Sequence, residues 1–159
     1  TVSARIKIDA GSEQWPAFWL MGNGDRWPHN ATEIDGFEFV EGQQKDRDIP
    51  FFTTHWGGSG SGCTDGHCQK GVYPAKVDKS QWHTYSIERT PTAIRQKIDG
   101  RTTAEITLEQ AKATGGDPTQ LFNQPMHIRL SNGSGGNWAD NPNGGPTAGA
   151  MYVDKVWTE

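Results

Sequence analysis

Short strand-like runs alternate with Gly-, Pro- and Asn-rich segments along the whole chain, and this alternation constrains the fold most strongly. The runs cover residues 3–10, 16–22, 33–40, 50–56, 83–89, 93–100, 126–132 and 151–157. Runs of this length between turn residues are typical of antiparallel strands in a sandwich or barrel. The chain has 159 residues and no evident linker. We therefore predict an all-β fold and a single domain over residues 1–159.

Two local signals refine this prediction in the second half of the chain. Asp99 and Gly100 form an Asp-Gly pair between two strand-like runs, which is a strong hairpin signal. Thr107 and Gln110 have the spacing of a helix capping box, and Gly115 is placed to end a helix. We expect one helix of about two turns there.

Charge and hydropathy exclude some classes of partner. The formal net charge is −4 and the isoelectric point is about 5.7, so the chain has no basic surface of the kind that binds nucleic acid. No apolar run approaches the roughly 18 residues of a membrane span. We expect a monomer that contacts neither nucleic acid nor membrane.

The two cysteines of the chain, Cys63 and Cys68, enclose the segment CTDGHC. A disulfide would close a short loop and stabilise the fold by roughly 2 kcal/mol. The alternative is a metal site with Asp65 and His67 as further ligands. The spacing is not that of the common zinc motifs, which favours the disulfide. A disulfide predicts a secreted protein, because the cytosol is reducing.

The segment EIDGFEFV places Glu33, Asp35 and Glu38 in an otherwise apolar run. Alternate side chains of a strand share a face, so Glu38 would point away from the other two carboxylates. One extra residue at Gly36–Phe37, a β-bulge, brings all three to one face and gathers the apolar side chains on the other. The hydrophobic pattern therefore predicts a bulge without reference to function.

Three carboxylates on one face repel one another, and this raises the pKa of at least one of them. A retaining glycosidase needs such a pair, with one ionised nucleophile and one protonated acid. Two alternatives remain at this point: a solvated acidic edge strand, or a calcium site.

The motif EIDGFE resembles the ExDxxE motif of glycoside hydrolase family 16, the laminarinase-like and agarase-like enzymes. The resemblance extends, in the family's order, over residues 4–22, 82–100, 122–140 and 151–157. It implies a β-jelly-roll sandwich of the concanavalin A-like type. It also implies that Glu33 is the nucleophile, Glu38 the general acid/base and Asp35 the assisting carboxylate between them.

The chain departs from the family in three respects. Thr32 stands where the family usually has Gly, and Gly36 stands where it has a larger apolar residue. Family members also have several strands ahead of the segment that begins at residue 4 here. We therefore expect the N-terminal strands of the family to be absent, as in a mature product or a fragment of a larger catalytic domain.

Aromatic and polar residues near the motif are candidates for binding sugar, because aromatic rings cover the apolar faces of sugar rings. By resemblance, Trp27 stacks on a sugar beside the cleavage point, His55 contacts a carboxylate or a hydroxyl group, and Asn132 lines the cleft. Trp138 lies in a polar Gly-rich loop, which favours a platform for sugar. Trp15 precedes a proline at a turn and has either a structural or a binding role.

The resemblance also bears on metals, activity and substrate. It implies that Asp154 helps to hold a structural calcium ion, whereas catalysis requires no cofactor. We expect a retaining endo-acting hydrolase of β-1,3-glucan or mixed-linkage β-1,3-1,4-glucan, in the laminarinase branch. The alternatives are a non-catalytic sugar-binding module, an agarase- or carrageenase-type enzyme, and a transglycosylase.

Overall fold

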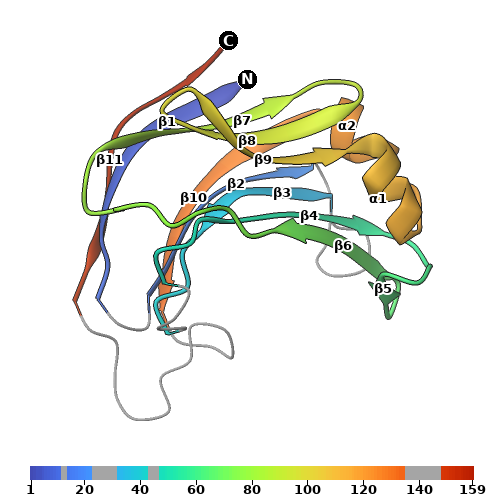
Figure 1. Cartoon of the computed structure of the whole chain (residues 1–159), viewed down its shortest axis with the longest axis horizontal. Coiled ribbons are helices and arrows are strands. Elements are labelled where there is room, and N and C mark those ends of the chain that lie inside the picture. Colours follow the sequence, from blue (N-terminus) through green and yellow to red (C-terminus); the bar gives the residue numbers. More distant parts are fainter. Residues whose placement is uncertain (12–13, 23–31, 43–46, 135–147) are drawn as a thin grey trace.

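Two antiparallel β-sheets stack face to face in the computed structural model, which describes residues 1–11, 14–22, 32–42, 47–134 and 148–159 (Figure 1). The first sheet has the strand order β11-β1-β7-β8-β9. Its strands are β1 (Val2–Asp9), β7 (His83–Arg89), β8 (Ala93–Ile98), β9 (Arg101–Thr107) and β11 (Ala150–Thr158). The hairpin between β8 and β9 turns at Asp99 and Gly100, both with positive φ, as the Asp-Gly pair predicted.

The second sheet has the strand order β10-β2-β3-β4-β6-β5. Its strands are β2 (Gln14–Gly22), β3 (Glu33–Glu38), β4 (Phe51–Gly57), β5 (Cys63–Thr64), β6 (His67–Val72) and β10 (Met126–Ser134). Strands β5 and β6 were not expected, because residues 57–71 contain many Gly and polar residues. Cys63 and Cys68 pair across these two strands and form the predicted disulfide, which excludes the metal site that needed both thiols.

Alternate residues of both sheets meet in one hydrophobic core, as the period of two in a strand requires. The largest fully buried side chains are Phe18, Ile34, Phe37, Phe39, Phe52 and Trp56 from the second sheet side, and Ile6, Ile8, Tyr85, Ile87, Ile94 and Ile106 from the first. The fold is therefore the sandwich that the sequence predicted. At the edges, β10 and β11 carry four apolar side chains that are 37–39% exposed: Ile128, Leu130, Val153 and Val156.

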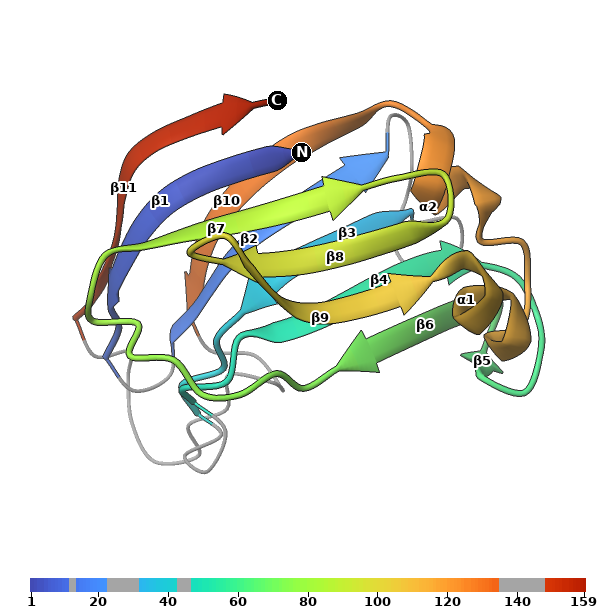
Figure 2. The ribbon, with the colours of Figure 1, turned by 45° about the horizontal axis from the view of Figure 1, so that its top comes forward.

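Two short helices lie together at one end of the sandwich (Figure 2). The predicted helix is α1 (Leu108–Thr114), and its capping box is present: Gln110 N–H donates to Thr107 Oγ1, and Thr107 N–H donates to Gln110 Oε1. Helix α2 (Thr119–Asn123) was not predicted. No helix in the described ranges is long and apolar enough to cross a membrane.

The predicted bulge is present in β3, and Gly36 is its extra residue. Phe18 pairs with Phe37 whereas Trp19 pairs with Asp35, so Gly36 has no partner on β2. The carbonyl of Gly36 instead accepts a hydrogen bond of 2.8 Å from Gln96, a fully buried residue of β8. The bulge is thus fixed by the opposite sheet, which satisfies the polar group that the bulge withdraws from its own ladder.

Space, rather than an unusual backbone conformation, explains glycine at position 36. A Cβ atom built there would lie 2.5 Å from Ile87 Cγ1 and 3.0 Å from Phe18 O. We predict that Gly36→Ala lowers the free energy of unfolding by about 1–3 kcal/mol, because the overpacked core must shift. Urea denaturation measures this change. Gly133→Ala is the matched control, since a Cβ there meets nothing within 4 Å; equal stability of the two variants would contradict the prediction.

Candidate active site

A cleft of about 850 Å³ lies on the face of the second sheet that is turned away from the core. Its wall combines acidic, aromatic and polar side chains from β2, β3, β4, β6 and β10. The lining residues are Trp15, Ala17, Trp19, Met21, Glu33, Asp35, Glu38, Phe51, Thr53, His55, Gln69, Gly71, Tyr73 and Arg129. Aromatic rings beside a few convergent polar groups are typical of a small-molecule or sugar site.

The bulge places the three carboxylates of β3 in this cleft. Glu33 and Asp35 share one face by strand alternation, and the extra residue Gly36 brings Glu38 to the same face. Asp35 and Glu38 are buried, with 3% and 6% of their surface exposed. The arrangement predicted from the hydrophobic pattern is therefore confirmed.

Burial raises the pKa of all three carboxyl groups, and charge repulsion is the second cause for Glu33 and Glu38. The pKa of Glu38 rises to about 9 through burial, then through the charges of Asp35 and Glu33, although a hydrogen bond from Trp15 opposes the rise. The pKa of Glu33 rises only to about 7, through burial and then the charge of Asp35, while His55 and Arg129 oppose it. Burial also raises the pKa of Asp35. Near neutral pH, Glu33 ionises before Glu38.

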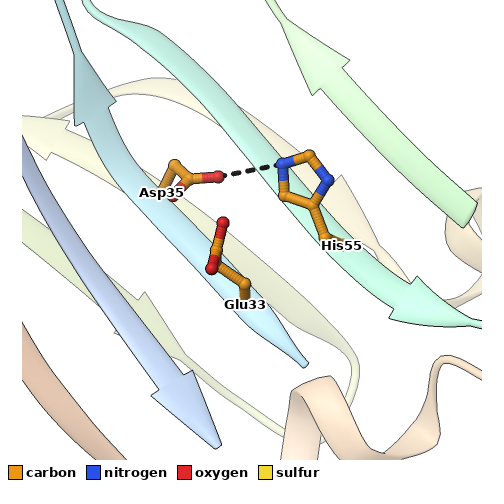
Figure 3. A group of neighbouring side chains, drawn as sticks. All are labelled: Glu33, Asp35 and His55. Carbon is orange, nitrogen blue, oxygen red and sulfur yellow. Dashed lines mark ion pairs between the residues drawn. The ribbon is translucent and has the colours of Figure 1, made fainter. Parts of the chain in front are cut away.

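His55 joins the carboxylates from the neighbouring strand β4 (Figure 3). Its Nε2 lies 3.1 Å from Asp35 Oδ2, and its Nδ1 lies 3.0 Å from Nε2 of His67 on β6. The contact with Asp35 is electrostatic, since Asp35 Oδ2 makes no directed hydrogen bond to any described residue. Burial lowers the pKa of His55 to about 4, so its ring is neutral at neutral pH.

Two tryptophans of β2 stand on the cleft side of the strand. Trp15 Nε1 donates a hydrogen bond of 2.9 Å to Glu38 Oε1, which gives Trp15 a contact in the site. Trp19 Nε1 donates to Ser131 Oγ at 3.1 Å, and the guanidinium of Arg129 lies 4.9 Å from the Trp19 ring. Neither Trp19 nor Arg129 was predicted as a site residue. Trp19 could have been recognised, because positions 15, 17 and 19 of one strand point to the same face.

Asn132 does not line the cleft, and this expectation is corrected. Asn132 pairs with Pro16, one position out of phase with Trp15, and its Nδ2 donates to Gln14 Oε1 at 3.4 Å. Strand alternation turns Ser131, and not Asn132, toward the cleft. The predicted sugar contacts Trp27 and Trp138 lie outside the described residues.

The predicted calcium residue, Asp154, lies on β11 and forms an exposed ion pair of 3.1 Å with Arg5. Among the described residues it belongs to no cluster of three potential metal ligands. Glu33, Asp35 and His55 do form such a cluster, with donor atoms within 4.8 Å of one another. Asp35 and His55 are already in contact with each other there, so the cluster is best described as a carboxylate–imidazole group.

The raised pKa of Glu38 makes the stability of the fold depend on pH. Between its ordinary value of 4.5 and about 9, the folded protein binds a proton that the unfolded chain has released. The free energy of unfolding therefore falls as the pH rises through this window. We predict that Glu38→Gln, which cannot titrate, is more stable than the wild type at pH 8, with a smaller difference at pH 5.

Thermal unfolding of both proteins across this pH range measures the effect. His55 acts in the opposite direction below pH 6.5, because its pKa is lowered in the folded state, but it does so in both proteins and cancels in the difference. Glu109→Gln, on the exposed surface of α1, is the control. Parallel stability curves for Glu38→Gln and wild type would show that the carboxyl is not protonated in the fold.

The comparisons with known proteins agree with this geometry. Residues 1–154 match the family described as Glycosyl hydrolases family 16. The chain is 26% identical to a beta-glucanase of Rhodothermus marinus, over 98% of this chain and 56% of the relative. It is 31% identical to the Crh-like protein 5 of Aspergillus fumigatus, over 72% of this chain and 27% of the relative.

Among solved structures, the endo-beta-1,3-glucanase of Pyrococcus furiosus superimposes with a TM-score of 0.74 at 31% identity. The match covers 98% of this chain and 58% of that one. The chain thus spans little more than half the length of this structure and of the Rhodothermus enzyme. Because the family match extends over nearly the whole sequence, the chain belongs to glycosyl hydrolases family 16.

Proposed function

We propose that this protein is a retaining, endo-acting hydrolase of β-1,3-glucan or mixed-linkage β-1,3-1,4-glucan. The observation that carries the proposal is the bulged strand β3, which presents three carboxyl groups of unequal pKa to one cleft. An acid and a nucleophile of different protonation state are what retaining hydrolysis requires.

In this mechanism, Glu33 is the carboxylate that ionises first, and it attacks the anomeric carbon. The glycosidic C–O bond breaks, Glu38 donates its proton to the departing oxygen, and a glycosyl ester forms on Glu33. Ionised Glu38 then takes a proton from water, whose oxygen displaces Glu33 from the anomeric carbon. Asp35 lies between the two on the strand; while burial keeps its own proton on, it does not oppose the charge on Glu33, and it orients that carboxylate.

The composition of the cleft supports a neutral glucan as the substrate. Trp15, Trp19 and Tyr73 provide aromatic surface for sugar rings. Arg129 is the single Lys or Arg residue among the described residues that line the cleft, whereas sulfated galactans call for several. The names of the relatives, a beta-glucanase and an endo-beta-1,3-glucanase, support the same substrate class. The disulfide supports a place of action outside the reducing cytosol.

The test is release of reducing ends from laminarin, lichenan, agarose and carrageenan, with NMR of the first product formed. We expect release from laminarin or lichenan, and a first product with the β configuration of the bond that was cleaved. Release from a galactan alone would overturn the substrate. Binding of glucan without release, by protein that unfolds cooperatively, would instead indicate a sugar-binding module.

A further inference from the structure

Two stacked histidines connect the carboxylates to the disulfide hairpin. The rings of His55 and His67 have centroids 5.1 Å apart and planes 24° apart. His67 Nε2 lies 3.0 Å from His55 Nδ1, and His55 Nε2 lies 3.1 Å from Asp35 Oδ2. His67, Cys68 and Cys63 belong to one hairpin, which the disulfide closes. A continuous line of polar contacts thus runs from β6 through β4 to β3.

The tautomers of imidazole restrict which ring nitrogens can carry a proton along this line of contacts. A neutral imidazole has one nitrogen that donates and one that accepts. Asp35 Oδ2 lies 3.1 Å from His55 Nε2 without a directed hydrogen bond, and its negative charge or partial charge favours a proton on that nitrogen whether the carboxyl is ionised or carries its proton on Oδ1. The arrangement that works in both states therefore has a proton on His55 Nε2, facing Asp35. His55 Nδ1 must then accept a hydrogen bond, and Nε2 of His67 is the group placed to donate it.

We propose that His67 is a positioning residue for the reaction: it donates to His55 Nδ1, fixes the Nε2-protonated tautomer of His55, and so orients Asp35 beside Glu33. The expected effect of His67 on kcat rests on the proposed hydrolase function, whereas the expected tautomer of His55 does not. Within the described part of the chain, Glu33 from β3 and Arg129 from β10 are ionisable groups of the cleft wall that face this cluster.

Two substitutions separate the hydrogen bond from the packing. His67→Phe keeps a ring that stacks on His55 but removes the donor, whereas His67→Gln keeps an N–H donor without the ring. We expect His67→Phe to lower kcat on laminarin oligosaccharides about tenfold with little change in KM, as for other partners that orient a functional histidine. His67→Gln should recover most of this loss.

His83→Phe is the matched control, because it removes a histidine that is hydrogen-bonded to Asp99 and Asp78 on the first sheet side, away from the cleft. We expect its kcat to equal that of the wild type at temperatures where both are folded. An equal loss in His83→Phe and His67→Phe would assign the effect to stability and overturn the proposal. A loss in His67→Gln as large as that in His67→Phe would also overturn it.

Nitrogen-15 NMR of the histidine rings tests the tautomer without any measurement of activity. In the wild type we expect His55 to be protonated on Nε2 and bare on Nδ1, and in His67→Phe we expect a mixture of both tautomers. A wild-type His55 protonated on Nδ1, or a tautomer unchanged in His67→Phe, would overturn the proposal. A protein that shows the expected tautomers but cleaves no glucan would leave the role of His67 toward His55 intact and refute the hydrolase.

Discussion

Replacing Glu33 by Ala should lower kcat on laminarin by at least about 10⁴-fold, because removing a nucleophile abolishes the covalent route and leaves only the contribution of binding and electrostatics. The loss should appear in kcat, since the aromatic walls of the cleft still bind the glucan. Reducing-end assays on the wild type and the variant measure it. Glu105→Ala, at an exposed position of strand β9, is the control and should retain full activity.

External azide makes this prediction more specific. In the cavity left by Glu33→Ala, azide can attack the anomeric carbon of an activated aryl β-glucoside from the face that Glu33 occupied. The bond to the aryl oxygen breaks, and the product is a glycosyl azide of α configuration. We expect this α-azide. Full activity of the variant without azide would remove Glu33 from the role of nucleophile.

The sequence was sufficient to predict the bulge and the common face of the carboxylates, because burial forces the apolar residues of a strand to one side. The need for glycine at position 36, by contrast, could not be explained from the sequence. The backbone of Gly36 has no unusual φ, and the residue is small because Ile87 of the other sheet occupies the space beside it. No local pattern in the sequence reports a contact between residues 51 positions apart.

The main cause of the carboxyl pKa shifts and the role of residues farther from the motif could not be predicted from the sequence either. Mutual repulsion was expected to raise the pKa values of the carboxyl groups, but burial under the cleft walls contributes more. His67 carried no signal of a role beside the carboxylates, because it lies in a Gly-rich stretch that was expected to be a loop and is in fact strand β6. The error at Asn132 has a similar origin: a resemblance identifies a segment, whereas strand register decides which side chain of that segment faces the cleft.

Replacing Glu38 by Ala should have a different effect that depends on the leaving group. With laminarin, loss of the general acid should lower kcat by about 10²–10⁴-fold, since the departing sugar oxygen needs a proton. With an aryl β-glucoside whose phenol is strongly acidic, formation of the glycosyl-enzyme should be nearly unaffected, and the intermediate should accumulate because no base activates water. Burst kinetics and mass spectrometry of the intact protein would detect it.

The two carboxylates can be told apart by the configuration of the rescued product. In Glu38→Ala, azide attacks the glycosyl-enzyme from the face opposite to Glu33, displaces the Glu33 carboxylate and gives a β-glycosyl azide, the reverse of the outcome for Glu33→Ala. Trp15→Phe, which removes the hydrogen bond to Glu38 but not the carboxyl group, should need no azide for turnover. An α-azide from Glu38→Ala, or no faster reaction with the better leaving group, would assign the acid role to another residue. Asp35, also buried in the cleft with a raised pKa, would then be the group to test.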